Sequence, residues 1–318
     1  MTNPTPLTRP RYMDAIRLRD LYGVTGPVPV ETGVKVAKAI LAVAAADGDV
    51  TEAETAWLFG SFRALGAPDD AVEALLKFDP RSADLKEILD EEVAPFARLV
   101  VHDAIRVARA DGLAGREREA ARRAARLVGV DAEVVLAIES LLAVDDALRA
   151  ARAVQLGAGE PVDFGSPAAR STPNVFVRER FGTRGEPSRA TVEKLARAVL
   201  AVASADGALS VGERGWFRST LRAYGMLPPA IEQLLNQDPG SHDVADALDA
   251  TLRPLARVVL YEAMHTARAD GLAGSERERA VIMAERLGLD AGVVAGLEGI
   301  ILLEDALRSA RVRVLSPP

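Results

Sequence analysis

The chain has 318 residues and a net charge of −7, and it contains no cysteine; 49% of its residues are apolar and only 4% are aromatic. The acidic balance disfavours general nucleic-acid binding, which needs a basic face to replace phosphate counterions. The lack of cysteine excludes disulfides, thiolate catalysis and zinc–thiolate sites, and is typical of a cytosolic protein. No window reaches the ~20 apolar residues of a membrane span, and residues 1–10 lack the apolar run of a signal peptide.

The chain contains an internal repeat of half its length. Residues 160–318 align with residues 1–159 without a gap, so each position in copy one has a counterpart 159 positions later in copy two. The eight residues from Ala108 to Gly115, for example, recur unchanged from Ala267 to Gly274. A period of this length is the size of a domain and too long for a solenoid repeat. We therefore expect two copies of one domain, each able to fold alone.

Each copy begins with a stretch rich in Pro, Gly, Ser and Thr. Residues 1–30 are predicted to be an extended N-terminal arm, and residues 157–188 a linker that carries a second arm. Both arms contain an aromatic residue followed by glycine, Tyr22 in the first and Phe181 in the second. A free linker has no use for an apolar anchor, so we expect both rings to be at least half buried. Each arm either packs on its own bundle or binds the other copy or a neighbouring molecule, which would make Tyr22 and Phe181 partner-binding residues.

The remaining segments, residues 31–156 and 189–318, are predicted to be helical domains. Apolar residues recur at helical spacing, and no sustained period-2 alternation predicts a strand. In copy one the periodic stretches begin near Val36 and Leu58 and continue over residues 69–78, 83–92, 94–110, 116–128, 132–142 and 144–155, with counterparts in copy two. The predicted fold class is therefore all-α, with two tandem homologous bundles of about seven helices each and extended N-terminal arms.

Each copy has two Ala-Asp-Gly junctions between apolar helices. The first junctions start at Asp47 and Asp206, and the later ones at Asp111 and Asp270. With these junctions the sequence resembles the TerB-like family of tellurite-resistance proteins, whose domain also occurs at the N-terminus of some membrane-anchored DnaJ-type co-chaperones. The resemblance covers residues 32–145 and 191–304. It implies an all-α fold of about seven helices and acidic clusters proposed to bind a divalent metal.

The first junctions have two interpretations. Oxygen donors on alternate residues followed by a carboxylate are typical of a site for a hard cation such as Ca²⁺, and the candidate ligands are Asp47, Asp49, Thr51 and Glu54 in copy one and Asp206, Ser210 and Glu213 in copy two. Copy two has Ala208 in place of Asp49, so we expect copy one to bind more tightly. Helix capping is the alternative, because Gly48 and Gly207 suit a helix C-terminus and Thr/Ser-x-x-Glu is a capping box.

The copies differ along one helix. Copy one has a basic stripe there, formed by Arg118, Arg122 and Arg126, and copy two has Val281 and Ile282 in place of Arg122 and Arg123. One interpretation is that the stripe is a solvated face. The other is that Val281 and Ile282 of copy two form a contact that copy one does not make. Elsewhere, Glu262-x-x-His265 has the spacing of a di-iron ligand pair, but no second Glu-x-x-His accompanies it.

These features predict a non-enzymatic binding or assembly protein with no required cofactor. The resemblance supplies a bacterial stress-response or membrane-associated context. We therefore expect a cytoplasmic protein, either free or peripheral to the inner membrane, with a protein partner or self-association as a homo-oligomer. Two alternatives stay open: a divalent-cation sensing or buffering protein, and a structural subunit linked to its neighbours through the arms.

Overall fold

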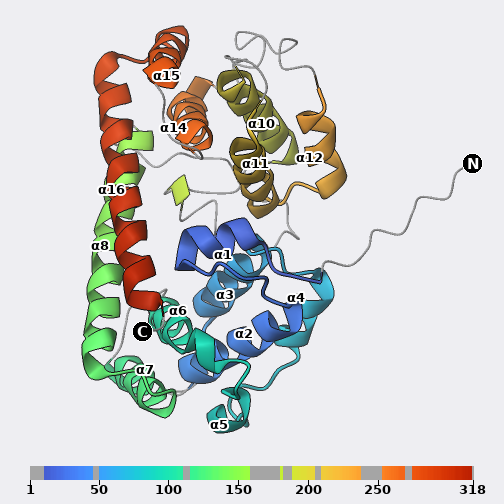
Figure 1. Ribbon diagram of the computed structural model, residues 1–318, viewed down its shortest axis with the longest axis vertical. Coiled ribbons are helices and arrows are strands. Elements are labelled where there is room, and N and C mark those ends of the chain that lie inside the picture. Colours follow the sequence, from blue (N-terminus) through green and yellow to red (C-terminus); the bar gives the residue numbers. More distant parts are fainter. Residues whose placement is uncertain are drawn as a thin grey trace, which may run out of the picture. The chain divides into compact units, whose positions relative to one another are not determined.

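The computed structural model describes residues 11–45, 50–109, 115–157, 180–181, 188–204, 209–237, 253–268 and 274–316 (Figure 1). These residues form fourteen α-helices and two short 3-10 helices, and their only β-type pairing is an isolated bridge between Tyr12 and Pro29. The all-α prediction is therefore confirmed.

The helices of copy one are α1 (Ala15–Tyr22), α2 (Val30–Ala44), α3 (Glu52–Ala64), α4 (Asp69–Leu76), α5 (Leu85–Ile88), η2 (Ala94–Phe96), α6 (Ala97–Ala108), α7 (Gly115–Leu127) and α8 (Ala132–Gly157). Those of copy two are α10 (Arg189–Ala203), α11 (Val211–Ala223), α12 (Pro228–Leu235), η4 (Arg253–Leu255), α14 (Ala256–Ala267), α15 (Gly274–Arg286) and α16 (Ala291–Leu315). Most helices of copy two thus begin and end 159 positions after their counterparts.

The first arm is not extended throughout, as the sequence analysis expected, because residues 15–22 form α1. The Asp14 side chain caps this helix by accepting hydrogen bonds from the backbone N–H groups of Ile16 and Arg17, at 3.0 and 3.1 Å. Gly23 ends it in the left-handed region, at φ 73°. The helix was missed because two turns are too short to show a clear apolar period.

Two further boundaries differ from the sequence pattern. The stretches at 132–142 and 144–155 form one helix, α8, since the residue between them, Ala143, is a strong helix former. The stretch at 83–92 is reduced to the single turn of α5, which Asp84 caps and which ends where Leu89 leaves the helical region, at ψ 56°.

The chain divides into two compact units. Unit 1 comprises Met1–Ser140 together with Arg311–Pro318, and unit 2 comprises Leu141–Ala310. The division falls within α8 and within α16, so the end of each copy's last helix belongs to the unit built mainly from the other copy. The domain boundaries expected from the repeat, at residues 31–156 and 189–318, stay a prediction.

Each unit has an aliphatic core around two central helices. In unit 1, α2 packs against α6 and α7, and the fully buried side chains include Ile40, Leu75, Ile105 and Ile138. In unit 2, α10 packs against α14 and α15, and the core includes Phe217, Leu297 and Ile301. Most residues of α2 and α6 in unit 1 and of α14 in unit 2 are buried, which is typical of helices packed on several sides.

Candidate functional site

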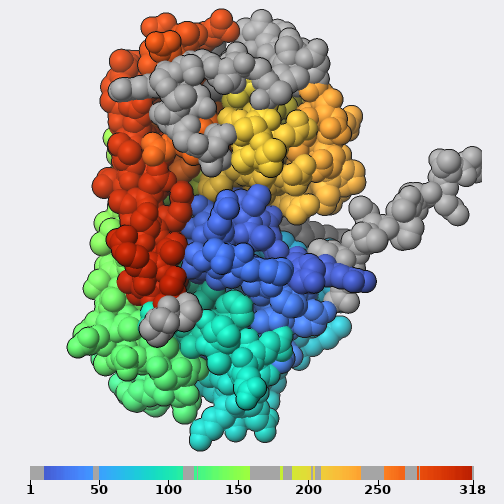
Figure 2. Space-filling model, viewed as in Figure 1, coloured from blue at the N-terminus to red at the C-terminus, as the bar shows by residue number. Residues whose placement is uncertain are grey.

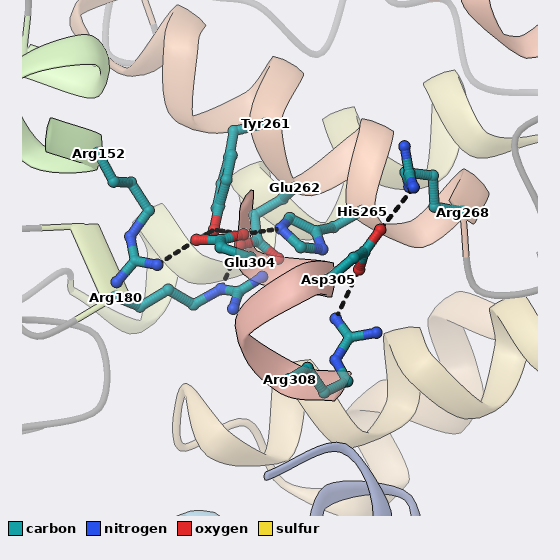
Figure 3. Close-up of polar contacts among 9 residues, drawn as sticks. All are labelled: Arg152, Arg180, Tyr261, Glu262, His265, Arg268, Glu304, Asp305 and Arg308. Carbon is teal, nitrogen blue, oxygen red and sulfur yellow. Dashed lines mark hydrogen bonds and ion pairs between the residues drawn. The ribbon is translucent and has the colours of Figure 1, made fainter. Parts of the chain in front are cut away.

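A cluster of charged and aromatic side chains is buried in unit 2 (Figure 3). Its centre is the carboxylate of Glu304 on α16. The Tyr261 hydroxyl donates to both Glu304 oxygens, at 2.8 and 2.9 Å, and His265 Nε2 lies 2.7 Å from Oε2. Tyr261 and His265 are four residues apart on α14 and so face the same side. Arg152 Nη1, from α8, forms an ion pair with the first oxygen.

A second ion pair lies beside the first. Arg180, which directly precedes the arm residue Phe181, donates from Nε to Glu262 Oε1 at 2.5 Å. Its guanidinium lies 5.2 Å from the centre of the Tyr261 ring and 5.9 Å from that of Trp216, within range of cation–π attraction. Arg180 Nη2 and Glu262 Oε2 are buried and have no hydrogen-bond partner in the part of the chain that the structure describes.

The electrostatics of this cluster favour a fixed charge arrangement. Burial alone would raise the pKa of Glu304, but the hydrogen bond from His265 and the charges of Arg152 and Arg180 hold it well below its usual value. Burial raises the pKa of the Tyr261 phenol, which therefore stays protonated and donates. A carboxylate with a lowered pKa and several donors is a poor proton acceptor. The arrangement is suited to holding three helices together and not to general-base chemistry.

The equivalent positions in unit 1 carry a smaller polar group. Asp103, the counterpart of Glu262, accepts a hydrogen bond from the Tyr22 hydroxyl at 2.8 Å and lies 2.7 Å from His102 Nδ1. Burial lowers the pKa of His102 and outweighs the hydrogen bond to Asp103, so the imidazole is neutral and Nδ1 is the donor. In each unit a carboxylate of one central helix thus binds an arm residue. Asp103 on α6 binds Tyr22, and Glu262 on α14 binds Arg180.

An apolar cavity of about 40 Å³ lies between α1 and the helices of unit 1. Leu18 and Tyr22 of α1 line it on one side and Ile40, Phe62 and Leu65 on others, and Asp103 lies at its edge. Gly33 also faces it; an added Cβ there would lie 3.1 Å from Met13 Sδ.

The candidate cation ligands fall partly outside the described residues. Asp47, Asp49 and Asp206 lie in the undescribed segments 46–49 and 205–208. Among the others, Thr51 and Glu54 form a complete capping box at the start of α3, and Ser210 and Glu213 form one at the start of α11. The capping interpretation is therefore confirmed for these four residues, while the cation site stays a prediction.

Both arm aromatics are buried, with exposed fractions of 7% for Tyr22 and 1% for Phe181, as the repeat predicted. Tyr22 contacts residues of its own copy, and the Phe181 ring packs on Tyr224 and Tyr261, also of its own copy. A role in binding a partner stays a prediction for both.

The helix where the copies differ also has a local explanation. Val281 is partly buried and packs against the core of unit 2, whereas Ile282 is 50% exposed. On the basic stripe, Arg118 and Arg122 form ion pairs with Glu139, at 3.7 and 3.5 Å. A contact of Val281 and Ile282 with a partner stays a prediction.

Sequence reasoning missed the cluster around Glu304. Glu262 and His265 have the spacing of a di-iron ligand pair but bind different partners: Glu262 pairs with Arg180, and His265 lies against Glu304. The signal available in the sequence was a long-range one: Arg152 and Arg311 occupy equivalent positions of the repeat, near the ends of α8 and α16. Among the described residues no three His, Asp or Glu side chains gather as metal ligands, and no helix is long and apolar enough to cross a membrane.

Comparison with known proteins gives little further information. No model of a known protein family matches the chain, and no curated protein matches its sequence. Among solved structures, it is similar to a tellurite resistance protein from Nostoc punctiforme, with 27% sequence identity over 46% of this chain and 93% of that one. The TM-score of that comparison is 0.44, so the fold assignment rests on the helices described above.

Proposed function

We propose that the chain is a non-enzymatic binding and assembly protein, built from duplicated TerB-like domains, in a bacterial stress-response system such as tellurite resistance. The observation that carries this proposal is how the buried charges are used. Both oxygens of Glu304 receive donors from three other side chains, and its lowered pKa fits it to hold α8, α14 and α16 together. Interactions with other molecules then fall to the outer surface.

The surface of α16 is the best candidate for a partner site. Leu302 and Leu303 are adjacent on this helix and are 56% and 57% exposed. Part of the surface of α16 is seen in red in Figure 2. Neighbouring exposed leucines favour a protein partner, since removing their side chains from water stabilises a complex. The net charge of −7 argues for a protein over a nucleic acid, and the lack of cysteine for a cytoplasmic location.

The two alternatives have weaker support. Capping already uses Thr51 Oγ1 and Glu54 Oε2, two of the oxygens that a cation sensor would need. A subunit linked through its arms would need Tyr22 to be available to a neighbour, and its hydroxyl is bonded within its own unit.

Genetic complementation tests the proposal. We expect deletion of the gene to sensitise the host to potassium tellurite and the intact chain to restore growth. The double variant Leu302→Glu/Leu303→Glu should fail to restore growth although its circular dichroism and melting temperature are unchanged. Val211→Glu is the matched control, because Val211 is 90% exposed on a different helix, and it should complement fully.

Each part of the proposal can fail separately. An unaffected deletion strain would refute the tellurite context. Full complementation by the double variant would refute the α16 surface as the binding face.

A further inference from the structure

The C-terminal end of α8 is anchored in unit 2 by residues of copy two. Arg257, on α14, donates a hydrogen bond from Nη1 to the backbone carbonyl of Gln155 at 2.7 Å. Leu156 is 2% exposed in the same core as Leu148, and Arg152 is ion-paired with Glu304. A guanidinium at the end of a helix satisfies carbonyls that have no partner within the helix and opposes the negative end of its dipole.

The C-terminal end of α16 is anchored in unit 1 in the same way, by residues of copy one. Arg98, on α6, donates from Nη1 to the carbonyls of Val314 and Ser316, at 3.0 and 2.5 Å. Leu315 is 6% exposed, and Arg311 donates to the carbonyl of Leu21 at 3.3 Å.

Four features of the two anchors are equivalent by position. In each case the two residues are 159 positions apart. The four pairs are the capping residues Arg98 and Arg257, the capped residues Gln155 and Val314, the buried Leu156 and Leu315, and the buried Arg152 and Arg311. Arg152 and Arg311 are even buried to the same extent, at 9% exposure. The α1 end adds a close approach in unit 1, where a Cβ on Gly23 would lie 2.7 Å from Val312.

We propose that the two copies are obligate partners that exchange the ends of their last helices. The interaction surface on copy two is the face of α14 around Arg257 with the core beside it, and its occupant is the end of α8, residues 148–157. The surface on copy one is the face of α6 around Arg98, and its occupant is the end of α16. Without its partner, each copy would have an exposed core face and a helix end without its capping arginine. On this proposal neither copy folds fully alone, contrary to the expectation from the repeat.

Cleavage of the linker in the intact protein tests this exchange. A protease site inserted between residues 165 and 166 allows the folded chain to be cut into its two copies. We expect the cut copies to elute together at the mass of the intact chain in gel filtration with light scattering, and each copy expressed alone to have reduced helical circular dichroism. Copies that separate at micromolar concentration and remain fully helical would overturn the proposal.

Substitution of the capping arginines tests the specific contacts. Arg257→Met and Arg98→Met should each raise the dissociation constant of the cut copies about tenfold or more, because each loses a charged hydrogen bond to a helix end. Arg257→Lys keeps the charge and should give a smaller rise in the same direction. Arg189→Met is the control, since Arg189 is exposed and, among the described residues, pairs with Glu193 of the same helix, and it should leave the constant unchanged. The exchange would be overturned if Arg257→Met and Arg98→Met left the dissociation constant unchanged. It would also be overturned if they raised it no more than the control Arg189→Met does.

Discussion

The carboxylate of Glu304 lies between two buried guanidiniums, so removing its charge alone should strongly destabilise unit 2. The perturbation is Glu304→Gln, which keeps the shape of the side chain and one acceptor for Tyr261. Arg152 and Arg180, with side chains 10% and 12% exposed, would then both lose the favourable charge of Glu304. Removing one partner of a buried ion pair costs roughly 3–5 kcal/mol of unfolding free energy. We expect the lower end, about 3 kcal/mol, because the amide oxygen still accepts one hydrogen bond.

The next residue provides a matched control. Asp305 also forms ion pairs, with Arg268 at 2.5 Å and Arg308 at 3.2 Å, but its side chain is 31% exposed. Asp305→Asn removes the same charge from the same helix and should cost less than about 1 kcal/mol, because solvent screens exposed pairs. The double variant Arg152→Met/Glu304→Gln should cost less than the two single changes added together, since the two side chains interact directly.

Urea unfolding followed by tryptophan fluorescence measures these costs in unit 2. The chain has two tryptophans, and in a Trp57→Phe background only Trp216, which stacks on His265 at 5.8 Å, reports. Equal costs for Glu304→Gln and Asp305→Asn would refute the argument that burial makes the Glu304 pair special. An additive double variant would refute the direct coupling.

Three further predictions concern local interactions, each checked by chemical denaturation. Thr51→Ala and Ser210→Ala should each cost about 0.5–2 kcal/mol, because each removes a helix cap, and a cost near zero in both would contradict the capping boxes. Tyr22→Phe should cost about 1–3 kcal/mol, since it leaves the buried Asp103 without one of its donors, and Tyr12→Phe at a 54% exposed position should cost nothing measurable. Because the folded pKa of His102 lies below its usual 6.5, the unfolded chain binds more protons there, and stability should fall as the pH drops from 6.5 through the folded pKa. His102→Asn, which keeps a donor for Asp103 but does not titrate, should remove part of that slope, and an unchanged slope would show that His102 does not cause it.

The sequence by itself determined the features that depend on neighbouring residues. The all-α class and the N-caps Thr51 of α3 and Ser210 of α11 follow from patterns within a few turns of chain. The burial of Tyr22 and Phe181 follows from the aromatic-Gly pair that both copies of the arm keep. Caps and apolar stripes are satisfied within a helix and its flanks, so the residues that carry them are close in sequence.

Only the tertiary structure decided which distant side chains meet. Arg152 and Glu304 are 152 positions apart, and Arg98 reaches the end of a helix more than 200 positions later. Nothing local distinguishes these arginines from the many others on exposed helix faces. Their partners are set by how the helices pack, because burial is what makes an ion pair specific and a helix end in need of a donor. The exchange of helix ends between the copies was hidden from the sequence for the same reason, since the repeat defines each copy but not the core in which its last helix ends.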